Sequence, residues 1–274
     1  MAFDVASIKQ SISGETPHAD FPWDAGDGYS PKGGLLSVTS FPLRNFIGFA
    51  YKLTSYQNLG LASQLPKWAT TERFDVEARA AQDNPTKDQM RLMMQSLLAD
   101  RFKLEAHVET RQDPVFALVL AKPGKIGPQL RPHPDDPHCS DAPIVAPVPG
   151  PEPTSSGKGT DALPAICGTL LGQAISGRMV MSGRNISMED LANNLVLLGR
   201  LDRDVVDETG LLGKFDLTMD APFLPPPSGV NVQPDPSAPT FLEVLQEQLG
   251  LKLVSKTGPV DVLVIDHVEE PSAN

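Results

Sequence analysis

The chain has 274 residues, 40% of them hydrophobic, which is enough to bury the core of one large or two ordinary domains and excludes disorder of the whole chain. Its 34 acidic and 23 basic residues give a formal net charge of −11, which repels nucleic acid and anionic lipid, so we expect no nucleic-acid partner. No segment approaches the roughly 18 to 20 uninterrupted apolar residues of a membrane helix, so we expect no membrane insertion.

The first predicted elements are two strands and an amphipathic helix. Residues 3–9 read as a strand, and Met1-Ala2 runs straight into it, as it would if a leader peptide had been removed. Residues 35–39 are strand-like. The apolar residues that follow recur at helical spacing: Leu43, Phe46, Ile47, Ala50 and Tyr51. They predict a helix with one buried face.

After a loop, residues 74–80 (FDVEARA) alternate between apolar and polar side chains, the period of a half-buried strand. A helix follows from Thr86, which opens a capping box. Residues 102–108 and 115–120 then read as the two strands of a hairpin that turns at Gln112-Asp113-Pro114.

The same order of elements returns in the second half. Residues 179–181 are strand-like, and Ser187 opens a helix with a variant capping box. Residues 215–221 (FDLTMDA) match the segment FDVEARA almost residue for residue. Thr240 caps a further helix. The chain then reads as a second hairpin, with strands at 251–254 and 260–265 around Thr257-Gly258-Pro259.

This repetition predicts an α+β fold made of two internally duplicated units, each with the order strand, helix, one or more strands, helix, strand, strand. We expect the first repeat, with its N-terminal strand, at residues 1–122 and the second at 177–274. Residues 123–176 are rich in Pro and Gly and read as a linker or long loop, and residues 222–239 read as a proline-rich loop.

The two cysteines, Cys139 and Cys167, flank or lie in the first of these Pro-rich segments. A disulfide between them would close a loop of about 30 residues and stabilise the fold by roughly 3 kcal/mol in the loop-entropy model. The alternative is a pair of free thiols in a cytoplasmic protein.

Three segments carry a resemblance to a known family: residues 205–216 (VVDETGLLGKFD), residues 248–253 (QLGLKL) with 264–268 (VIDHV), and residues 97–104 (LLADRFKL). With them the chain resembles, nearly end to end, the soil-associated family of unknown function that is abundant as paralogues in acidobacteria. The resemblance implies an extracytoplasmic protein, periplasmic or secreted, and relatives of the domain can be attached to BlaR-type membrane metallopeptidases. It implies no known reaction.

Each helix-and-hairpin half is also similar, in pattern rather than identity, to the short N-terminal domain of secretins and TonB-dependent receptors. In those domains a capped helix that ends in a Gly-Leu step leads into paired strands, as residues 241–265 do here. This similarity implies binding of a partner protein.

Familiar catalytic motifs are absent from the sequence, which contains no G-x-S-x-G, no P-loop, no G-x-G-x-x-G and no H-E-x-x-H. We therefore lean against an enzyme and expect no cofactor. Metal-ligand residue types cluster between residues 133 and 139, namely His133, Asp135, Asp136, His138 and Cys139. Their spacing fits no recognised motif and prolines interrupt them, so we predict a solvated loop rather than a metal site.

Aromatic side chains outside the periodic faces are the first candidates for ligand contact, because loop aromatics can anchor partners. They are Trp23, Tyr29, Tyr56 and Trp68. Arg73 near Trp68 completes the recognition surface that we consider first, and covering the edge of the core is the alternative role.

Asp207 and Thr209 precede a strand, where such residues bond to nearby backbone, so a turn is favoured over a binding loop.

Three functions compete on this evidence. The first is an exported, non-enzymatic binding or sensor protein that receives a small molecule or peptide in the cleft between the two halves or at an exposed strand edge, with another protein as a further candidate. The second is a hydrolase of unrecognised type with a site of Asp, Glu and His residues. The third is an assembly module that pairs with other chains along strand edges. A pocket in which a histidine and a carboxylate lie within hydrogen-bond reach would favour the second.

Overall fold

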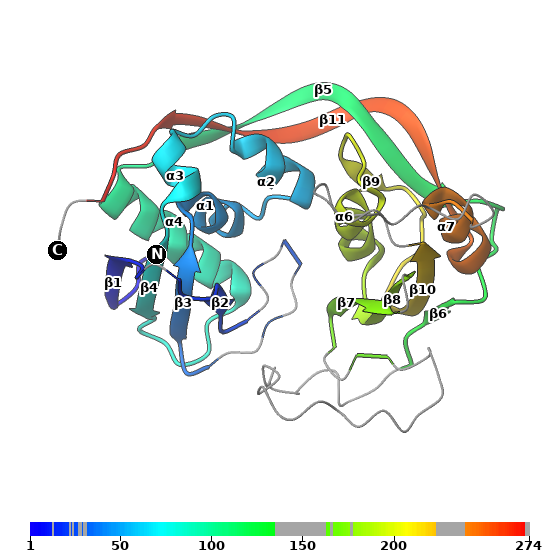
Figure 1. Ribbon diagram of the computed structural model, residues 1–274, viewed down its shortest axis with the longest axis horizontal. Coiled ribbons are helices and arrows are strands. Elements are labelled where there is room, and N and C mark those ends of the chain that lie inside the picture. Colours follow the sequence, from blue (N-terminus) through cyan, green and yellow to red (C-terminus); the bar gives the residue numbers. More distant parts are fainter. Residues whose placement is uncertain are drawn as a thin grey trace. The chain divides into compact units, whose positions relative to one another are not determined.

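In a computed structural model the chain forms an α+β fold that divides into two compact units (Figure 1). The structure describes residues 1–12, 14–21, 23, 25–26, 29, 32–134, 163–164, 167–175, 178–222 and 239–271. Of these, residues 1–114 and 257–271 belong to the first unit, and residues 115–134 and 163–256 belong to the second. Each unit has its own hydrophobic core.

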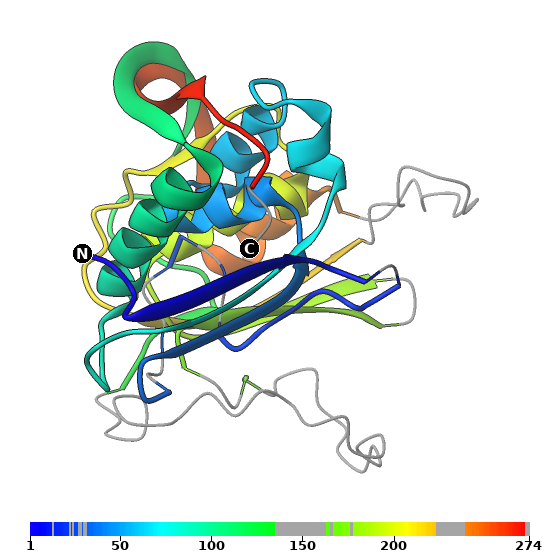
Figure 2. The same ribbon diagram turned by 90° about the vertical axis from the view of Figure 1, so that its left-hand side faces the viewer.

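The first unit is built on an antiparallel sheet with helices on one side (Figure 2). In sheet order its strands are β1 (Val5–Gln10), β4 (Phe74–Arg79), β3 (Leu35–Phe41) and β2 (His18–Ala19). The helices are α1 (Leu43–Ala50), α2 (Ser55–Leu61), α3 (Lys67–Thr71) and α4 (Lys87–Phe102). The predicted capping box of α4 is confirmed, with Thr86 and Gln89 bonding each other's backbone.

The second unit has the same construction. Its antiparallel sheet contains, in order, β6 (Leu130–Pro132), β10 (Phe215–Pro222), β8 (Arg178–Ile186) and β7 (Thr169–Ile175). Its helices are α6 (Met188–Gly199) and α7 (Phe241–Leu249), and a short strand β9 (Val205–Asp207) lies between them in sequence. Both helices begin with the predicted capping boxes, at Ser187 and Thr240. Burial alternates along β10 as predicted, with Phe215, Leu217 and Met219 in the core.

Both predicted hairpins are wrong. Residues 105–120 form one uninterrupted strand, β5 (Glu105–Leu120), and β11 (Leu251–His267) is likewise continuous. These strands are neighbours in one sheet, where β9 pairs in parallel with β5 (Figure 1). Each strand passes from one unit to the other, β5 after Pro114 and β11 before Thr257. The predicted turn residues lie inside strands because each strand pairs with a partner distant in sequence, not with its own continuation.

The compact units consequently divide the chain differently from the predicted boundaries. The last part of β11 belongs to the first unit. The predicted linker, residues 123–176, contains β6 and β7, and the predicted loop before Phe74 contains α2 and α3. Residues 135–162 and 223–238, within the two predicted Pro-rich loops, lie outside the described residues.

Both four-stranded sheets contain the same irregularity. The register shifts near Ser40, a residue within β3 whose φ is 61°, and near Asn185, a residue within β8 whose φ is 54°. In each unit an aspartate of the neighbouring strand accepts a hydrogen bond from that residue's N–H, Asp75 from Ser40 at 2.8 Å and Asp216 from Asn185 at 2.9 Å. This shared bulge supports an internal duplication, which stays an inference from the repeated pattern.

Candidate functional site

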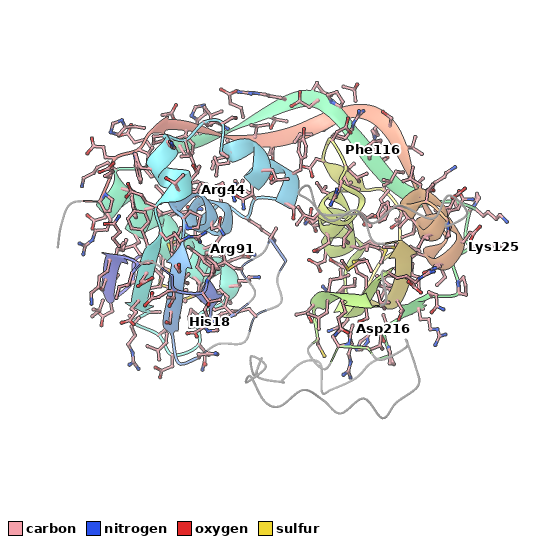
Figure 3. All side chains as sticks on the ribbon, in the orientation of Figure 1. His18, Arg44, Arg91, Phe116, Lys125 and Asp216 are labelled. Carbon is pink, nitrogen blue, oxygen red and sulfur yellow. The ribbon has the colours of Figure 1, made fainter. Side chains whose placement is uncertain are left out.

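The polar face of β10 carries the pocket from which we build the candidate site. Asp216 and Thr218 alternate with the buried residues of this strand and point away from the core. Together with side chains of β6 and Leu163 they line a pocket of about 160 Å³. Its lining residues are Gln129, Arg131, Leu163, Asp216, Leu217 and Thr218. Figure 3 labels Asp216 at the beginning of β10.

Asp216 is held in place by two hydrogen bonds to the same carboxylate oxygen. Oδ1 accepts from the backbone N–H of Asn185 at 2.9 Å and lies 2.7 Å from Nδ1 of His133. No other hydrogen bond or ion pair of this side chain exists among the described residues. With respect to the described residues, the second oxygen, Oδ2, can accept hydrogen bonds from a ligand.

His133 is the buried partner of this carboxylate. Its side chain is 7% exposed and that of Asp216 is 15% exposed. Because a carboxylate only accepts hydrogen bonds, Nδ1 of His133 donates in this contact. Nε2 is buried and has no hydrogen-bond partner in the part of the chain that the structure describes. The backbone N–H of His133 donates to the carbonyl of Lys214 at 2.8 Å, which fixes the residue beside β10.

The first unit offers a direct comparison for this arrangement. Asp75 holds the bulge at Ser40 as Asp216 holds the bulge at Asn185, but its second partner is the hydroxyl of Ser11 rather than an imidazole. The aspartate thus has a structural role common to both units. In the second unit the equivalent carboxylate also bonds to His133 and lines the pocket.

The described residues contain no group of three or more His, Cys, Asp or Glu side chains able to hold a metal ion. Of the predicted ligand cluster only His133 is described, since residues 135–139 are not. Cys139 is among them, so the pairing of Cys139 with Cys167 stays a prediction. No helix in the described part of the chain has the length and apolar character to span a membrane.

Trp23 is partly buried and packs against the aromatic core of the first unit, and its role in ligand contact stays a prediction. Its ring stacks on Phe49 with centroids 3.9 Å apart, and its indole N–H donates to the carbonyl of Asn45 at 3.0 Å. Tyr29 packs edge-on against Phe21 in the same cluster, and burial raises the pKa of its hydroxyl. Packing therefore accounts for both side chains.

Trp68 and Arg73 also make structural contacts within the first unit. Trp68 lies in α3, not in a loop, and packs parallel to Phe102 with ring centroids 6.4 Å apart. Arg73 donates from Nη1 to the carbonyl of Ser40 at 2.8 Å and so supports the bulge. Their role in recognition stays a prediction.

The remaining predicted residues lie apart from the pocket lining. Tyr56 lies in α2 and is 36% exposed. The carboxylate of Asp207 accepts from the N–H of Thr209 at 2.9 Å, and the hydroxyl of Thr209 accepts from the N–H of Leu211 at 3.1 Å. This is turn geometry, as the sequence favours.

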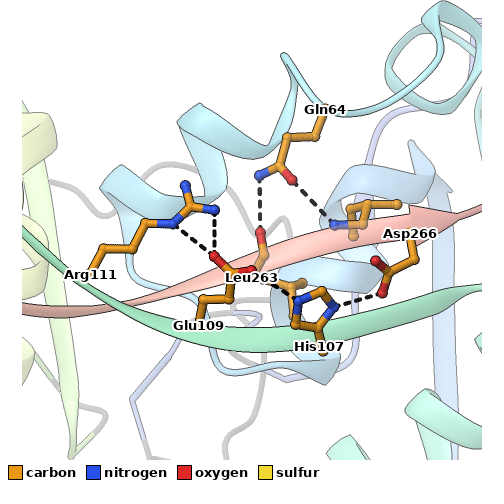
Figure 4. A network of polar contacts seen from close by, with 7 residues as sticks. Gln64, His107, Glu109, Arg111, Leu263 and Asp266 are labelled. Carbon is orange, nitrogen blue, oxygen red and sulfur yellow. Dashed lines mark hydrogen bonds and ion pairs between the residues drawn. The ribbon is translucent and has the colours of Figure 1, made fainter.

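A second polar cluster joins β5 to β11 in the first unit (Figure 4). Nδ1 of His107 lies 2.7 Å from Oδ2 of Asp266, and its Nε2 lies 3.2 Å from Oε1 of Glu109. Arg111 donates twice to the other oxygen of Glu109, at 2.7 and 3.0 Å. The side-chain amide of Gln64 donates to the carbonyl of Leu263 and accepts from the N–H of Ile265, both in β11. All four ionisable side chains are about half exposed, so this cluster is a solvent-accessible polar network that links the two strands.

Stability should depend on pH through this cluster. Hydrogen bonds to Asp266 and then to Glu109 raise the pKa of His107. Protonated His107 therefore favours the folded state below its ordinary pKa of about 6.5, and this contribution disappears as pH rises through the raised value. We expect the stability difference between wild type and His107→Gln, measured by urea unfolding, to shrink across that window. A difference that grows with pH would contradict the assignment.

Sequence reasoning singled out His133 but not the residues with which it acts. The sequence placed His133 in a cluster of metal-ligand residue types. Its partner Asp216 is 83 residues away in the chain, so sequence spacing does not link the two. The only local signal was the aspartate shared by FDVEARA and FDLTMDA.

Comparison with known proteins gives a family but no function. No curated protein and no solved structure matches the chain. The model of the family described as protein of unknown function (DUF3738) matches residues 44–268, a span that contains β6, β10 and the pocket. The chain belongs to the DUF3738 family of proteins of unknown function.

Proposed function

We propose that this protein is an exported, non-enzymatic binding protein that takes a small polar ligand in the pocket on the polar face of β10. The single observation that carries the proposal is Asp216, a pocket-lining carboxylate fixed through Oδ1 and without a protein partner at Oδ2 among the described residues. A preformed pocket with a few fixed polar groups is the usual form of a small-molecule site. The ligand must supply a hydrogen-bond donor to this carboxylate.

A ligand-induced thermal shift tests the binding site. We expect at least one small polar compound, from a chemically diverse set, to raise the melting temperature of the wild type but not of Asp216→Asn. Asp75→Asn is the matched control, because Asp75 holds the equivalent bulge in the first unit and does not line the pocket. Equal ligand-induced shifts in the two variants would refute the site. So would a compound set in which no member raises the melting temperature of the wild type.

A hydrolase is the second candidate, and the hydrogen bond between His133 and Asp216 is what favours it. A carboxylate that orients an imidazole through Nδ1 leaves Nε2 as a general base. No described hydroxyl or thiol bonds to Nε2, which is buried, so this mechanism requires an opening of the site that lets water reach Nε2 as the nucleophile. Turnover of ester, amide or glycoside substrates that His133→Gln abolishes and Asp75→Asn preserves would establish this alternative over simple binding.

Export is the part of the proposal that rests on the resemblance read from the sequence and on the predicted pair of Cys139 and Cys167. Relatives attached to a membrane metallopeptidase would give such a binding domain a sensor role. Protein isolated from its native host and denatured without reductant should expose no reactive thiol. Two reactive thiols under those conditions would argue for a reducing compartment.

A further inference from the structure

We propose that the pocket binds a small zwitterionic amino acid, with its carboxylate at Arg131 and its ammonium group at Asp216. This inference rests on the proposed binding function and names the class of ligand. It follows from two opposite charges that line one pocket without pairing with each other.

Arg131 supplies the positive charge. It lies on β6 directly opposite Asp216 of β10, so the two side chains project from the same face of the sheet. Its side chain is exposed and makes no hydrogen bond or ion pair with any described residue. A guanidinium group in this position can bind a carboxylate through two parallel N–H···O bonds.

Asp216 and its neighbours supply the acceptors for an ammonium group, which has three N–H donors. Oδ2 of Asp216 is available, and the hydroxyl of Thr218 projects from the same face of β10 two residues further on. Gln129, just before β6, also lines the pocket and has a side-chain carbonyl as a further acceptor.

The two charges are cross-strand neighbours, yet no ion pair joins them. A ligand with a single negative charge would be attracted by Arg131 and repelled by Asp216. A ligand with a single positive charge would be attracted by Asp216 and repelled by Arg131. A zwitterion satisfies both groups at once. The pocket, at about 160 Å³, is several times larger than a single water needs, and Leu163 provides an apolar wall for a short side chain.

The test is a titration of the whole isotope-labelled protein with L-alanine, followed by backbone amide resonances. We expect shifts concentrated at β6 and β10 and saturable binding. Lactate, which keeps the carboxylate and a neutral donor, and alaninamide, which keeps the ammonium group, should each bind at least about tenfold more weakly, since each loses one charge-assisted contact.

Variants separate the two ends of the ligand. Arg131→Gln should weaken L-alanine binding by about tenfold or more, while Lys125→Gln, at an exposed cation of the same unit outside the pocket lining, should leave it unchanged. Asp216→Asn should weaken it similarly, with Asp75→Asn as its control.

Three results would overturn the inference: no L-alanine shift at β6 and β10, equal binding of lactate, or equal binding by Arg131→Gln. If a compound of another class binds and Asp216→Asn abolishes its binding, the proposed function stands and only the ligand class is wrong. If no compound depends on Asp216, both fail.

Discussion

Replacing Trp23 by alanine is expected to lower the free energy of unfolding of the first unit by about 3 kcal/mol, a value typical of removing an aromatic side chain from a core. The ring stacks on Phe49 at an interplanar angle of 17° and meets Phe46 edge-on at 5.9 Å. Truncation would leave a cavity beside both rings and an unpaired carbonyl at Asn45.

Gly26, three residues after Trp23, is held by two side chains of α4. The carbonyl of Gly26 accepts from Nζ of Lys87 at 2.6 Å and from Nη2 of Arg91 at 2.8 Å, and both cations are nearly fully buried in α4. Because these bonds hold the loop against the helix, the cavity cannot be filled by a simple collapse of the loop. The loss of unfolding free energy in Trp23→Ala should therefore not fall far below the values typical of removing a core aromatic side chain.

Tryptophan fluorescence in urea measures the unfolding of the first unit, because both tryptophans of the chain, Trp23 and Trp68, belong to that unit. Trp68 then reports on the variant. Tyr56→Ala is the control, since Tyr56 is 36% exposed, and we expect a change of at most about 0.5 kcal/mol. Wild-type stability of Trp23→Ala together with lost ligand binding would contradict the packing role and support Trp23 as a recognition residue.

Gly127→Ala is expected to destabilise the second unit by about 3 kcal/mol or more, at the upper end of overpacking costs. A Cβ atom at Gly127 would lie 2.3 Å from the carbonyl oxygen of Gln248 and 2.5 Å from the nitrogen of Gly250. These are backbone atoms at the end of α7, which cannot rotate away as a side chain would. The N–H of Gly127 also donates to Leu249 at 2.8 Å, so the two segments cannot separate without losing that bond.

Hydrogen exchange measures this effect by unit. Amides of β10 and α7 should lose protection in Gly127→Ala, whereas those of β4 in the first unit should keep it. Gly124→Ala is the control in the same segment: its φ is 68°, but a Cβ there meets no atom within 4 Å, so we expect a cost of only about 1 to 2 kcal/mol. Because Gly124 has a positive φ and Gly127 does not, equal losses in the two variants would contradict the expected clash at Gly127.

The sequence by itself determined the parts of the fold whose causes are local. The helices that begin at Thr86, Ser187 and Thr240 were predictable because an N-cap and its N3 partner are three residues apart. The strands β4 and β10 were predictable because alternation shows which face is buried. The α+β class followed from the order of these elements.

Only the tertiary structure decided what depends on pairing between distant residues. Pro114 and Pro259 read as turn residues, but β5 and β11 bond to each other across more than 130 residues, and such long-range partners leave no local mark. The candidate site has the same origin. Asp216 meets His133 and Arg131 because β6 pairs with β10, and neither residue's neighbours in sequence specify that register. Local periodicity fixes elements, whereas the choice of partner strand is made by the packing of the whole core.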